Sequence, residues 1–338
     1  MNHNISIEPI GNKSLWDKFI DESPNSLLFH KWDFLKIAEK YTGYKVYAYG
    51  FYRRDELISV LPIFHKKRKG MNFVYSPPQT TLSYIPYMGF AFSPTYYHLN
   101  QHEKESGLCS MISEMDQVLR GLSANYVSYA TVPGDVDSRP YIWNGYEALL
   151  QYTYVIDLER PLEAIWEEFD RNCRKRIEAA EKLRPSVIRS DDSGTLFRIM
   201  RERFADQGDT FFHRQTPEYL KELLSTFPDE IKMYFIYSGD ELIGADVNCE
   251  YKDLCMSWMG TAVMKENLNA NEYMLWEIIK GAKDAGKKRY ENLGADEKRL
   301  NDFKAKFNPS LIPYFYIIKK NILYRTTSYI MEKMSKKA

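Results

Sequence analysis

The chain has 338 residues and carries 46 Lys plus Arg against 46 Asp plus Glu, so its formal net charge is zero. A neutral total argues against a protein that binds DNA or an anionic membrane over a broad surface, although a local basic patch can exist within it. Hydrophobic residues make up 44% and charged residues 27%, which is typical of a globular protein long enough for two domains. No apolar run reaches the roughly 18 residues that a membrane span needs, and the polar first residues do not resemble a signal peptide. We therefore expect a cytoplasmic protein without a membrane span.

The four cysteines are Cys109, Cys173, Cys249 and Cys255, and their spacing is not that of metal ligands. We expect no metal site, and we expect Cys249 and Cys255 to be core residues on neighbouring strands. Aromatic residues are abundant at 15%, with 26 tyrosines. Two interpretations stay open: the tyrosines border the sheets, or they line a cleft that holds a sugar, a nucleotide or an acyl chain.

The first half of the chain predicts strands and helices in alternation. Ser14 is a candidate cap for a helix that carries Trp16 and Phe19. Two alternating runs on either side of Arg53-Arg54-Asp55 predict a β-hairpin. In chain order we expect a strand from Ile5 to Pro9, a helix from Ser14, a helix over 32–40, strands over 46–52 and 56–66, a helix over 104–123 and a strand over 125–130.

The second half predicts a small α/β unit. Residues 237–262 alternate like half-buried strands around a turn at Lys252-Asp253. Asn271 is a candidate helix cap, and Gly286 is placed to end that helix in a left-handed conformation. In chain order we expect a strand over 152–156, one basic helix over 162–183, a helix over 195–204, strands within 237–262, a helix over 271–285 and a strand over 289–293.

Short words recur between the two halves at a nearly constant offset. Tyr52-x-x-Asp55-Glu56-Leu57-Ile58 is echoed by Tyr237-x-x-Asp240-Glu241-Leu242-Ile243, and Phe29-His30-Lys31 is echoed by Phe212-His213-Arg214. The matches occur in the same order, which predicts a duplicated domain. The alternative is that helix–hairpin units converge on similar words.

Several of these short motifs, together with others, occur in the same order as in a known family that the chain resembles. They are Trp16-x-x-Phe19, Phe29-His30-Lys31-Trp32-x-x-x-Lys36, the run RNCRKRIEAAEK at 171–182, Phe212-His213-Arg214-x-x-x-x-Tyr219, the segment 269–286, and Phe303-Lys304-x-x-Phe307. Together they resemble the FemABX-like and BioF2-like acyltransferases, which carry two tandem GNAT-type (acyl-CoA N-acyltransferase) domains.

The resemblance implies an α/β (α+β) fold in which each domain has a mixed, mostly antiparallel central sheet flanked by helices. It places an N-terminal domain at 1–150, a C-terminal domain at 151–320 and a tail at 321–338. It implies an N-acyltransferase that moves an acyl or aminoacyl group from an activated donor to an amine. The acceptor would be a small molecule or a glycan or peptide precursor of the cell envelope or a polysaccharide.

The donor is left open by the resemblance. Relatives use either aminoacyl-tRNA or acyl-CoA and acyl-carrier proteins, so we expect one of these as a co-substrate and no permanently bound cofactor. The segment 264–269 lacks the glycine-rich loop with which ordinary GNAT enzymes hold a pyrophosphate. This departure weighs against a conventional acetyl-CoA enzyme. The neutral charge and the lack of a long coiled-coil insertion weigh against aminoacyl-tRNA as the donor. We expect a monomer or a homodimer.

The resemblance also assigns roles to individual residues. Lys36 and Arg214, with Tyr219 beside them, match positions that hold a substrate diphosphate, and Lys304 matches a lysine near the reacting ester. We also expect Trp258 and Asn271 to bind the substrate.

The chemistry itself sets further requirements. Acyl transfer to an amine needs alignment, a neutral amine and support for a tetrahedral oxyanion. We expect Lys304 to give that support and Asp246 to accept the proton of the amine, with Glu250 as an equal rival on the same face of its strand. No Ser-His-Asp or Cys-His pattern stands out, so direct transfer is favoured over a covalent intermediate. Two alternatives remain: a peptidyltransferase of the Fem type that depends on aminoacyl-tRNA, and a non-catalytic binding protein on a GNAT scaffold.

Overall fold

A computed structural model describes residues 5–79, 83–135, 137–205, 216–262 and 270–335. The chain divides into two compact units, Met1–Gln151 with Pro313–Ala338, and Tyr152–Ile312. The last segment therefore groups with the first half of the chain, whereas the sequence led us to expect it in the second domain and a tail. Among the described helices, none combines the length and the apolar character that a membrane crossing requires.

The sheet of the first unit has the strand order β1-β2-β3-β4-β6-β13, with the short β5 beside β3. Its described pairs are antiparallel, apart from the parallel pair of β4 and β6. The pairing of β13 with β6 explains why the end of the chain belongs to this unit. The strands are β1 (Ile5–Pro9), β2 (Lys45–Arg53), β3 (Glu56–Arg68), β4 (Met71–Ser76), β5 (Ala91–Phe92), β6 (Ala124–Ala130) and β13 (Ser310–Lys320).

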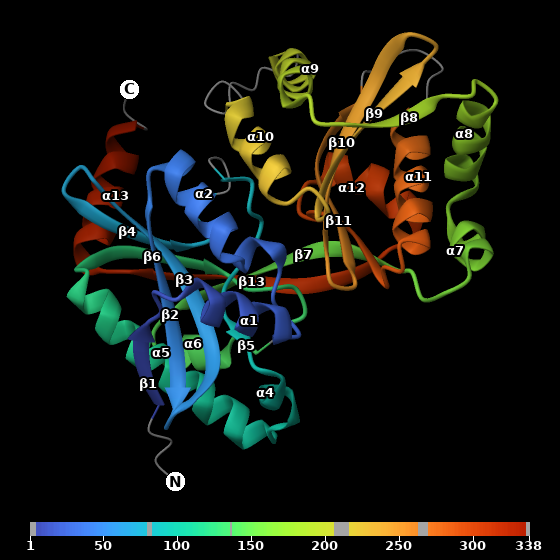
Figure 1. Cartoon of the computed structure of the whole chain (residues 1–338). Helices are drawn as coiled ribbons and strands as arrows, with labels where there is room; N and C mark the ends of the chain where they lie inside the picture. The colour runs from blue at the N-terminus through green and yellow to red at the C-terminus, as the bar shows by residue number, and fades with distance from the viewer. Residues whose placement is uncertain (1–4, 80–82, 136, 206–215, 263–269, 336–338) are drawn as a thin grey trace. The chain divides into compact units, whose positions relative to one another are not determined.

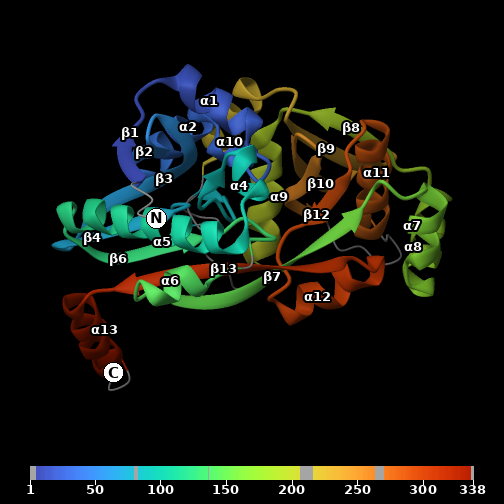
Figure 2. The ribbon, with the colours of Figure 1, turned by 90° about the horizontal axis from the view of Figure 1, so that it is seen from below.

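Helices cover both faces of this first sheet. Figure 2 shows α1 and α2 on one face and α5 on the other. The long α5 belongs to the crossover between β4 and β6, and its buried face packs into the core with strand residues such as Leu61 and Val127. The helices are α1 (Lys13–Glu22), η1 (Leu28–His30), α2 (Trp32–Thr42), α4 (Pro94–His98), α5 (Gln101–Gly121), α6 (Arg139–Trp143) and α13 (Ile322–Ser335).

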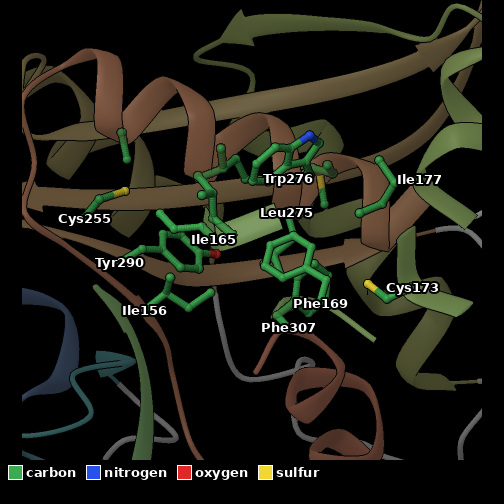
Figure 3. Close-up of a cluster of buried hydrophobic side chains, with 14 of the residues drawn as sticks. Ile156, Ile165, Phe169, Cys173, Ile177, Cys255, Leu275, Trp276, Tyr290 and Phe307 are labelled. Carbon is green, nitrogen blue, oxygen red and sulfur yellow. The ribbon is translucent and has the colours of Figure 1, made fainter. Parts of the chain in front are cut away.

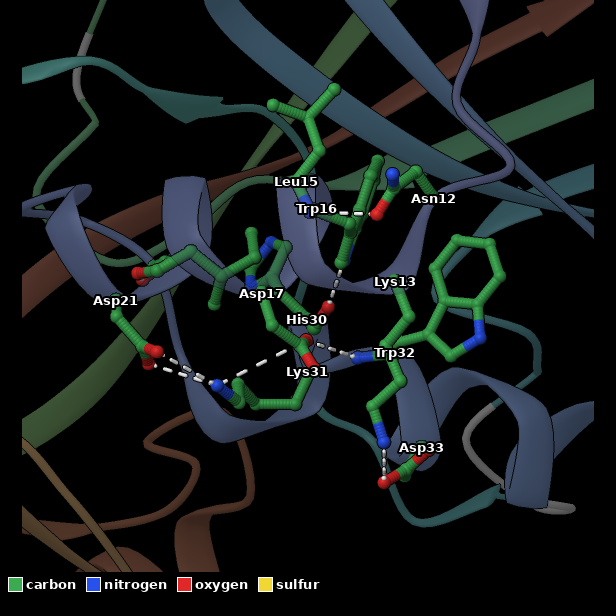
Figure 4. A network of polar contacts seen from close by, with 12 residues as sticks. Asn12, Lys13, Leu15, Trp16, Asp17, Asp21, His30, Lys31, Trp32 and Asp33 are labelled. Atoms are coloured by element: carbon green, nitrogen blue, oxygen red, sulfur yellow. Dashed lines mark hydrogen bonds and ion pairs between the residues drawn. The ribbon is translucent and has the colours of Figure 1, made fainter.

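The word Phe29-His30-Lys31 forms part of a structural network between α1 and α2 (Figure 4). The indole Nε1 of the fully buried Trp16 donates to the carbonyl oxygen of His30 at 2.6 Å, and Lys31 Nζ donates to Asp21 at 2.9 Å. The expected cap at Ser14 is wrong: α1 begins at Lys13, and the side chain of Asn12 accepts from the backbone N–H of Leu15.

The sheet of the second unit has the order β7-β12-β11-β10-β9-β8. Here too the described pairs are antiparallel except one, the parallel pair of β11 and β12, which α11 connects. The strands are β7 (Glu147–Asp157), β8 (Ser186–Ser190), β9 (Ile231–Ser238), β10 (Glu241–Tyr251), β11 (Leu254–Ala262) and β12 (Arg289–Asn292).

Helices also cover both faces of the second sheet, with α11, α7 and α8 on one side and α9 and α10 on the other (Figure 2). The single basic helix expected over 162–183 is wrong, because the chain breaks at Phe169 and Asp170. The carboxylate of Asp170 accepts from the backbone N–H of Asn172 at 2.8 Å and caps a new helix. The helices are α7 (Leu162–Glu168), α8 (Arg171–Glu181), α9 (Ser193–Ala205), α10 (Pro217–Thr226), α11 (Ala270–Asp284), α12 (Lys298–Lys304) and η3 (Ala305–Phe307).

The repeated words at 52–58 and 237–243 fall on matching hairpins, one in each unit. In the first, Tyr52 pairs with Leu57 and Phe51 with Ser59, so Ile58 is an extra bulged residue. In the second, Tyr237 pairs with Leu242 and Ile236 with Gly244, so Ile243 is the extra residue. The same turn followed by the same bulge, within the same strand order, confirms the predicted repeat for this hairpin. The echo at 212–214 lies outside the described residues.

The core of the second unit is built around Phe169 at the break between α7 and α8 (Figure 3). Its ring centroid lies 5.3 Å from that of Trp276 on α11 and 5.0 Å from that of Phe307 after α12. Phe307 in turn packs edge-on against Phe303 at 5.6 Å. This aromatic cluster therefore ties the loop that follows α12 to the rest of the unit. The expected core cysteines Cys249 and Cys255 are confirmed as buried.

Replacement of Phe169 by Ala should destabilise the second unit, because it removes a buried ring that contacts both α11 and the end of α12. Large-to-small substitution of a buried Phe costs about 3–5 kcal/mol. Chemical denaturation followed by tryptophan fluorescence measures this loss. Phe169→Leu is the matched control and should cost less than half as much; equal stability of Phe169→Ala and the native protein would contradict the packing.

Candidate active site

The parallel pair of β11 and β12 ends early. Leu254–Ser257 pair with Arg289–Asn292, but β11 runs on to Ala262 without β12 beside it. On its other edge β11 carries a bulge at Trp258, because Val247 pairs with Met259 and Asn248 with Ser257. A bulge bends its strand, so β11 changes direction where it leaves β12. Two groups of buried ionisable side chains lie near this end, one on each face of the sheet.

The first group lies on the face of the sheet that α11 covers. Asp246 on β10 is 5% exposed, and its Oδ2 accepts from the hydroxyl of Ser257 on β11 at 2.9 Å. Burial raises the pKa of the Asp246 carboxyl to about 7, and the Ser257 hydrogen bond opposes that rise. Among the described residues, its second oxygen, Oδ1, has no hydrogen-bond partner. Asp246 thus combines a pKa near neutrality with a free acceptor atom.

The glycine opposite Asp246 makes room for the carboxylate. Gly260 pairs with Asp246 across β10 and β11. A Cβ at residue 260 would lie 2.5 Å from Asp246 Oδ2 and 3.1 Å from the carbonyl oxygen of Ala245. The carboxylate therefore occupies the space that any larger residue at 260 would need.

Glu250, the rival of Asp246 in the sequence analysis, is engaged elsewhere. Its Oε2 accepts from Lys232 Nζ at 2.9 Å and lies 3.9 Å from Lys287 Nζ. The carboxylate of Glu250 is thus engaged in ion pairs, whereas Oδ1 of Asp246 has no hydrogen-bond partner among the described residues.

The second group lies on the opposite face of β12, because side chains alternate along a strand and Glu291 follows Tyr290, which is in the α11 core. Glu291 is 3% exposed, and its Oε1 accepts from the hydroxyl of Thr153 on β7 at 2.7 Å. Burial raises the pKa of Glu291 to about 8, and the nearby ammonium of Lys304 opposes the rise.

Lys304 ends α12 with its amine pointing at the chain just after β12. Its Nζ donates to the carbonyl oxygens of Leu293 and Gly294, the latter at 2.9 Å. Burial lowers the pKa of Lys304 to about 8, while the charges of Glu291, Glu297 and Asp296 oppose the fall. The surrounding fold fixes this lysine, since Phe303 packs on Phe307 and the Lys306 carbonyl oxygen accepts from the Asp170 backbone N–H at 2.8 Å.

The register brings both groups to one end of the strand pair. Ser257, which holds Asp246, pairs with Asn292, and the next residue along the chain, Leu293, accepts from Lys304. A molecule beside the end of β12 could be approached by an acid from one face and by an amine from the other. An acid and an amine are the kinds of group that can accept a proton and donate a hydrogen bond to developing charge.

Other residues selected from the sequence lie elsewhere or are not described. Lys36 is on α2 of the first unit, where it pairs with Glu39 and lines a cavity of about 190 Å³ with Trp32 and Tyr47. Arg214 lies outside the described residues. The roles assigned to both stay predictions.

Three further candidates are in the second unit. Tyr219 on α10 is 2% exposed, and Trp258 is the buried bulge residue of β11. Asn271 is half-buried. It was expected to cap its helix, but α11 begins at Ala270, so Asn271 lies within the first turn.

Sequence reasoning missed Ser257, Glu291 and Thr153. Ser257 and Thr153 are small polar residues in strands, which usually carry no signal. Glu291 carried a signal, because it lies in the short predicted strand at 289–293. In the structure this strand, Arg289–Asn292, is an interior strand that pairs with β11 on one side and β7 on the other. An acid in an interior strand is buried, and buried acids with shifted pKa values gather at functional sites.

The chain was compared with protein families, curated protein sequences and solved structures. Residues 168–305 match the family of acetyltransferase (GNAT) domains. No curated protein sequence matches the chain. Among solved structures, FemX is similar with a TM-score of 0.67 and 12% identity, covering 91% of this chain and 96% of FemX.

Two other similar structures have comparable coverage. L-PGS from Bacillus licheniformis has a TM-score of 0.55 and 12% identity, over 95% of this chain and 96% of that one. A tandem GNAT protein from the clavulanic acid biosynthesis pathway has a TM-score of 0.55 and 7% identity, over 94% and 98%. At such identities the likeness shows the fold. The chain therefore carries a region similar to GNAT acetyltransferase domains at 168–305 within a FemX-like GNAT fold.

Proposed function

We propose that the protein transfers an acyl or aminoacyl group directly to an amine of a small-molecule, glycan or peptide acceptor, such as a precursor of the cell envelope or of a polysaccharide. The observation that carries this proposal is that an acid of raised pKa, Asp246, and a lysine of lowered pKa, Lys304, lie on opposite faces of the sheet near the end of one short strand pair. Both groups titrate near neutral pH, where such a reaction needs them.

Lys304 supports the developing oxyanion in this proposal. An ammonium has three N–H donors, and two are engaged by the carbonyl oxygens of Leu293 and Gly294 among the described residues. These carbonyl groups fix the amine in place, so the third hydrogen can point at the carbonyl oxygen of the donor without reorganisation. Fixed donors of this kind are among the largest contributions to acyl transfer.

Asp246 accepts the proton that the amine loses. The amine nitrogen forms a bond to the acyl carbon, the bond from that carbon to the leaving sulfur or oxygen breaks, and the proton passes by way of Asp246 Oδ1 to the leaving group. Ser257 holds the other carboxylate oxygen and so orients the free one. No covalent enzyme intermediate is needed.

The donor is either a thioester or an aminoacyl-tRNA, the two kinds of donor that the family resemblance implies. We favour a thioester because the net charge of the chain is zero and a nucleic-acid partner is bound mainly through basic residues. The corresponding acceptor is a small amine compound or an envelope precursor handled in the cytoplasm.

Labelled donors separate these alternatives. Purified protein is incubated with cell extract and either radiolabelled acyl-CoA or radiolabelled aminoacyl-tRNA, with and without ribonuclease. We expect label to move from the thioester to an amine product and to resist ribonuclease. Transfer that is abolished by ribonuclease would select tRNA instead, and no transfer from any donor would leave a binding protein on a GNAT scaffold.

Lys304→Met should lower kcat by about 10²–10³-fold, the usual cost of losing one oxyanion donor. Lys298→Met is the matched control, because Lys298 lies on the same helix with its side chain 89% exposed. Steady-state kinetics on both variants, with circular dichroism to check folding, decide the point. Native turnover in a folded Lys304→Met protein would remove this lysine from the mechanism.

The pH dependence of kcat should be bell-shaped. Asp246 works as the ionised base, so activity rises with pH through about 7, and Lys304 works as the ammonium, so activity falls as pH rises through about 8. Asp246→Asn should lose about 10²–10⁴-fold in kcat and lose the acidic limb of the profile. The control Asp253→Asn, in the exposed turn between β10 and β11, should keep both limbs; an acidic limb that persists in Asp246→Asn would assign the base elsewhere.

A further inference from the structure

The last helix of the chain, α13, leaves large apolar side chains exposed. It follows β13 directly, and Figure 2 shows it projecting away from the sheet of its own unit. Its exposed apolar residues are Ile322 at 84%, Leu323 at 56%, Tyr329 at 58%, Ile330 at 52% and Met331 at 56%. Apolar residues gathered on one exposed element mark a surface that binds a partner.

One inward contact fixes which side of α13 faces outward. The ring centroid of Tyr324 lies 4.9 Å from that of Tyr126 on β6 and 6.0 Å from that of Phe73 on β4. Leu323 and Ile330 are seven residues apart and so share one side of the helix, and both are more than half exposed. Helix α13 is therefore attached to its unit along one side and carries an apolar stripe along another.

The positive charge of the chain is concentrated at this helix. Residues 319–338 contain six of the 46 Lys and Arg residues but only one of the 46 Asp and Glu residues, Glu332. The rest of the chain therefore has an excess of acids, and the neutral total conceals a basic terminal segment. Within α13, Lys333 Nζ lies over the ring of Tyr329, 4.6 Å from its centroid, so a cation borders the apolar residues.

Neighbouring acids neutralise only part of this charge. Lys319 pairs with Asp116 at 2.7 Å, while Lys320 and Arg325 share the single carboxylate of Glu147 at 3.7 and 3.6 Å. With these two acids and the one in the segment included, six basic side chains stand against three carboxylates. The excess disfavours a second copy of the chain as the occupant, because in a symmetric dimer the same basic surface would face itself.

We propose that α13 docks on the surface of an anionic membrane, with its apolar stripe among the acyl chains and its basic side chains at the lipid phosphates. Apolar residues bordered by Lys and Arg are typical of helices that lie in such a surface without crossing it. The stems of the basic side chains cover apolar surface while their charges reach the headgroups. The proposal concerns binding alone, so it does not depend on the proposed transfer reaction.

Co-sedimentation of the full chain with large unilamellar vesicles tests the proposal. The vesicles contain phosphatidylcholine alone, or equal amounts of phosphatidylcholine and the anionic phosphatidylglycerol. We expect binding to the anionic vesicles to be about tenfold tighter and to weaken as salt is added, because salt screens charges at a surface. Equal binding to both kinds of vesicle, or binding to neither, would overturn the proposal.

Substitutions in the apolar stripe locate the contact. The double variant Leu323→Ser with Ile330→Ser should weaken binding to anionic vesicles by about tenfold or more, because it removes apolar surface from the membrane. The matched control is Leu183→Ser with Ile188→Ser, a leucine and an isoleucine of the second unit that are similarly exposed, at 50% and 51%. This control should bind as the native chain does, and undiminished binding by the α13 double variant would refute the site.

Lys333→Gln is a second test, which leaves the apolar stripe intact. One basic residue near an anionic surface strengthens binding about fivefold, so this variant should lose about that factor on anionic vesicles and nothing on phosphatidylcholine. An unchanged affinity for anionic vesicles would contradict the electrostatic contact, and circular dichroism checks that each variant keeps its helices. Light scattering without vesicles gives the oligomeric state. A dimer that the double variant dissociates, in a chain that binds no vesicle, would assign this surface to a second copy and overturn the proposal.

Discussion

The carbonyl oxygens of Leu293 and Gly294 hold the Lys304 amine at the place where β12 ends, and this contact underlies the account of the site. It exists because the parallel pair of β11 and β12 stops at Ser257 and Asn292. A longer β12 would have used those carbonyl groups in the strand ladder. Because the ladder stops there, its last carbonyl groups are available to a side chain.

The aromatic cluster of the second unit makes that contact possible. A lysine amine is strongly hydrated, and burying it in the protein costs free energy unless neighbouring groups hydrogen-bond to it and hold it in place. Phe303 and Phe307 on either side of Lys304 pack toward Phe169, which also marks the break between α7 and α8. The core of the unit thus stabilises the position of the residue that we assign to the oxyanion, and the cost of burial appears as its lowered pKa.

Much of the fold could be predicted from the sequence, because hairpins leave a strong local signal. The words at 52–58 and 237–243 contain a turn between alternating residues, and the structure shows the same bulge after each. Cap positions were harder. Asn12 rather than Ser14 caps α1, and Asp170 divides a helix that periodicity alone would continue. A cap depends on the direction in which the chain enters the helix, and tertiary contacts decide that direction.

The candidate site was predicted less completely. Asp246 and Lys304 were selected from the sequence, but Ser257 and Glu291 were not, since each acts through a neighbour on another strand. Glu250 could not be separated from Asp246 by alternation alone. What distinguishes the two acids is the ion pair of Glu250 with Lys232. This ion pair joins two neighbouring strands, and the periodicity of a sequence does not show which strands are neighbours. Registers between strands therefore carry the information that the linear pattern lacks.

The most direct test of the central claim is an NMR titration of the side-chain ε-methylene group of Lys304 in protein labelled with ¹³C-lysine, assigned with Lys304→Met. The account predicts a midpoint at about 8 for this lysine, and a change in its signal when the acyl donor binds. A midpoint at the ordinary value of about 10.4, unaffected by any donor, would contradict the placement of this amine in the reacting site.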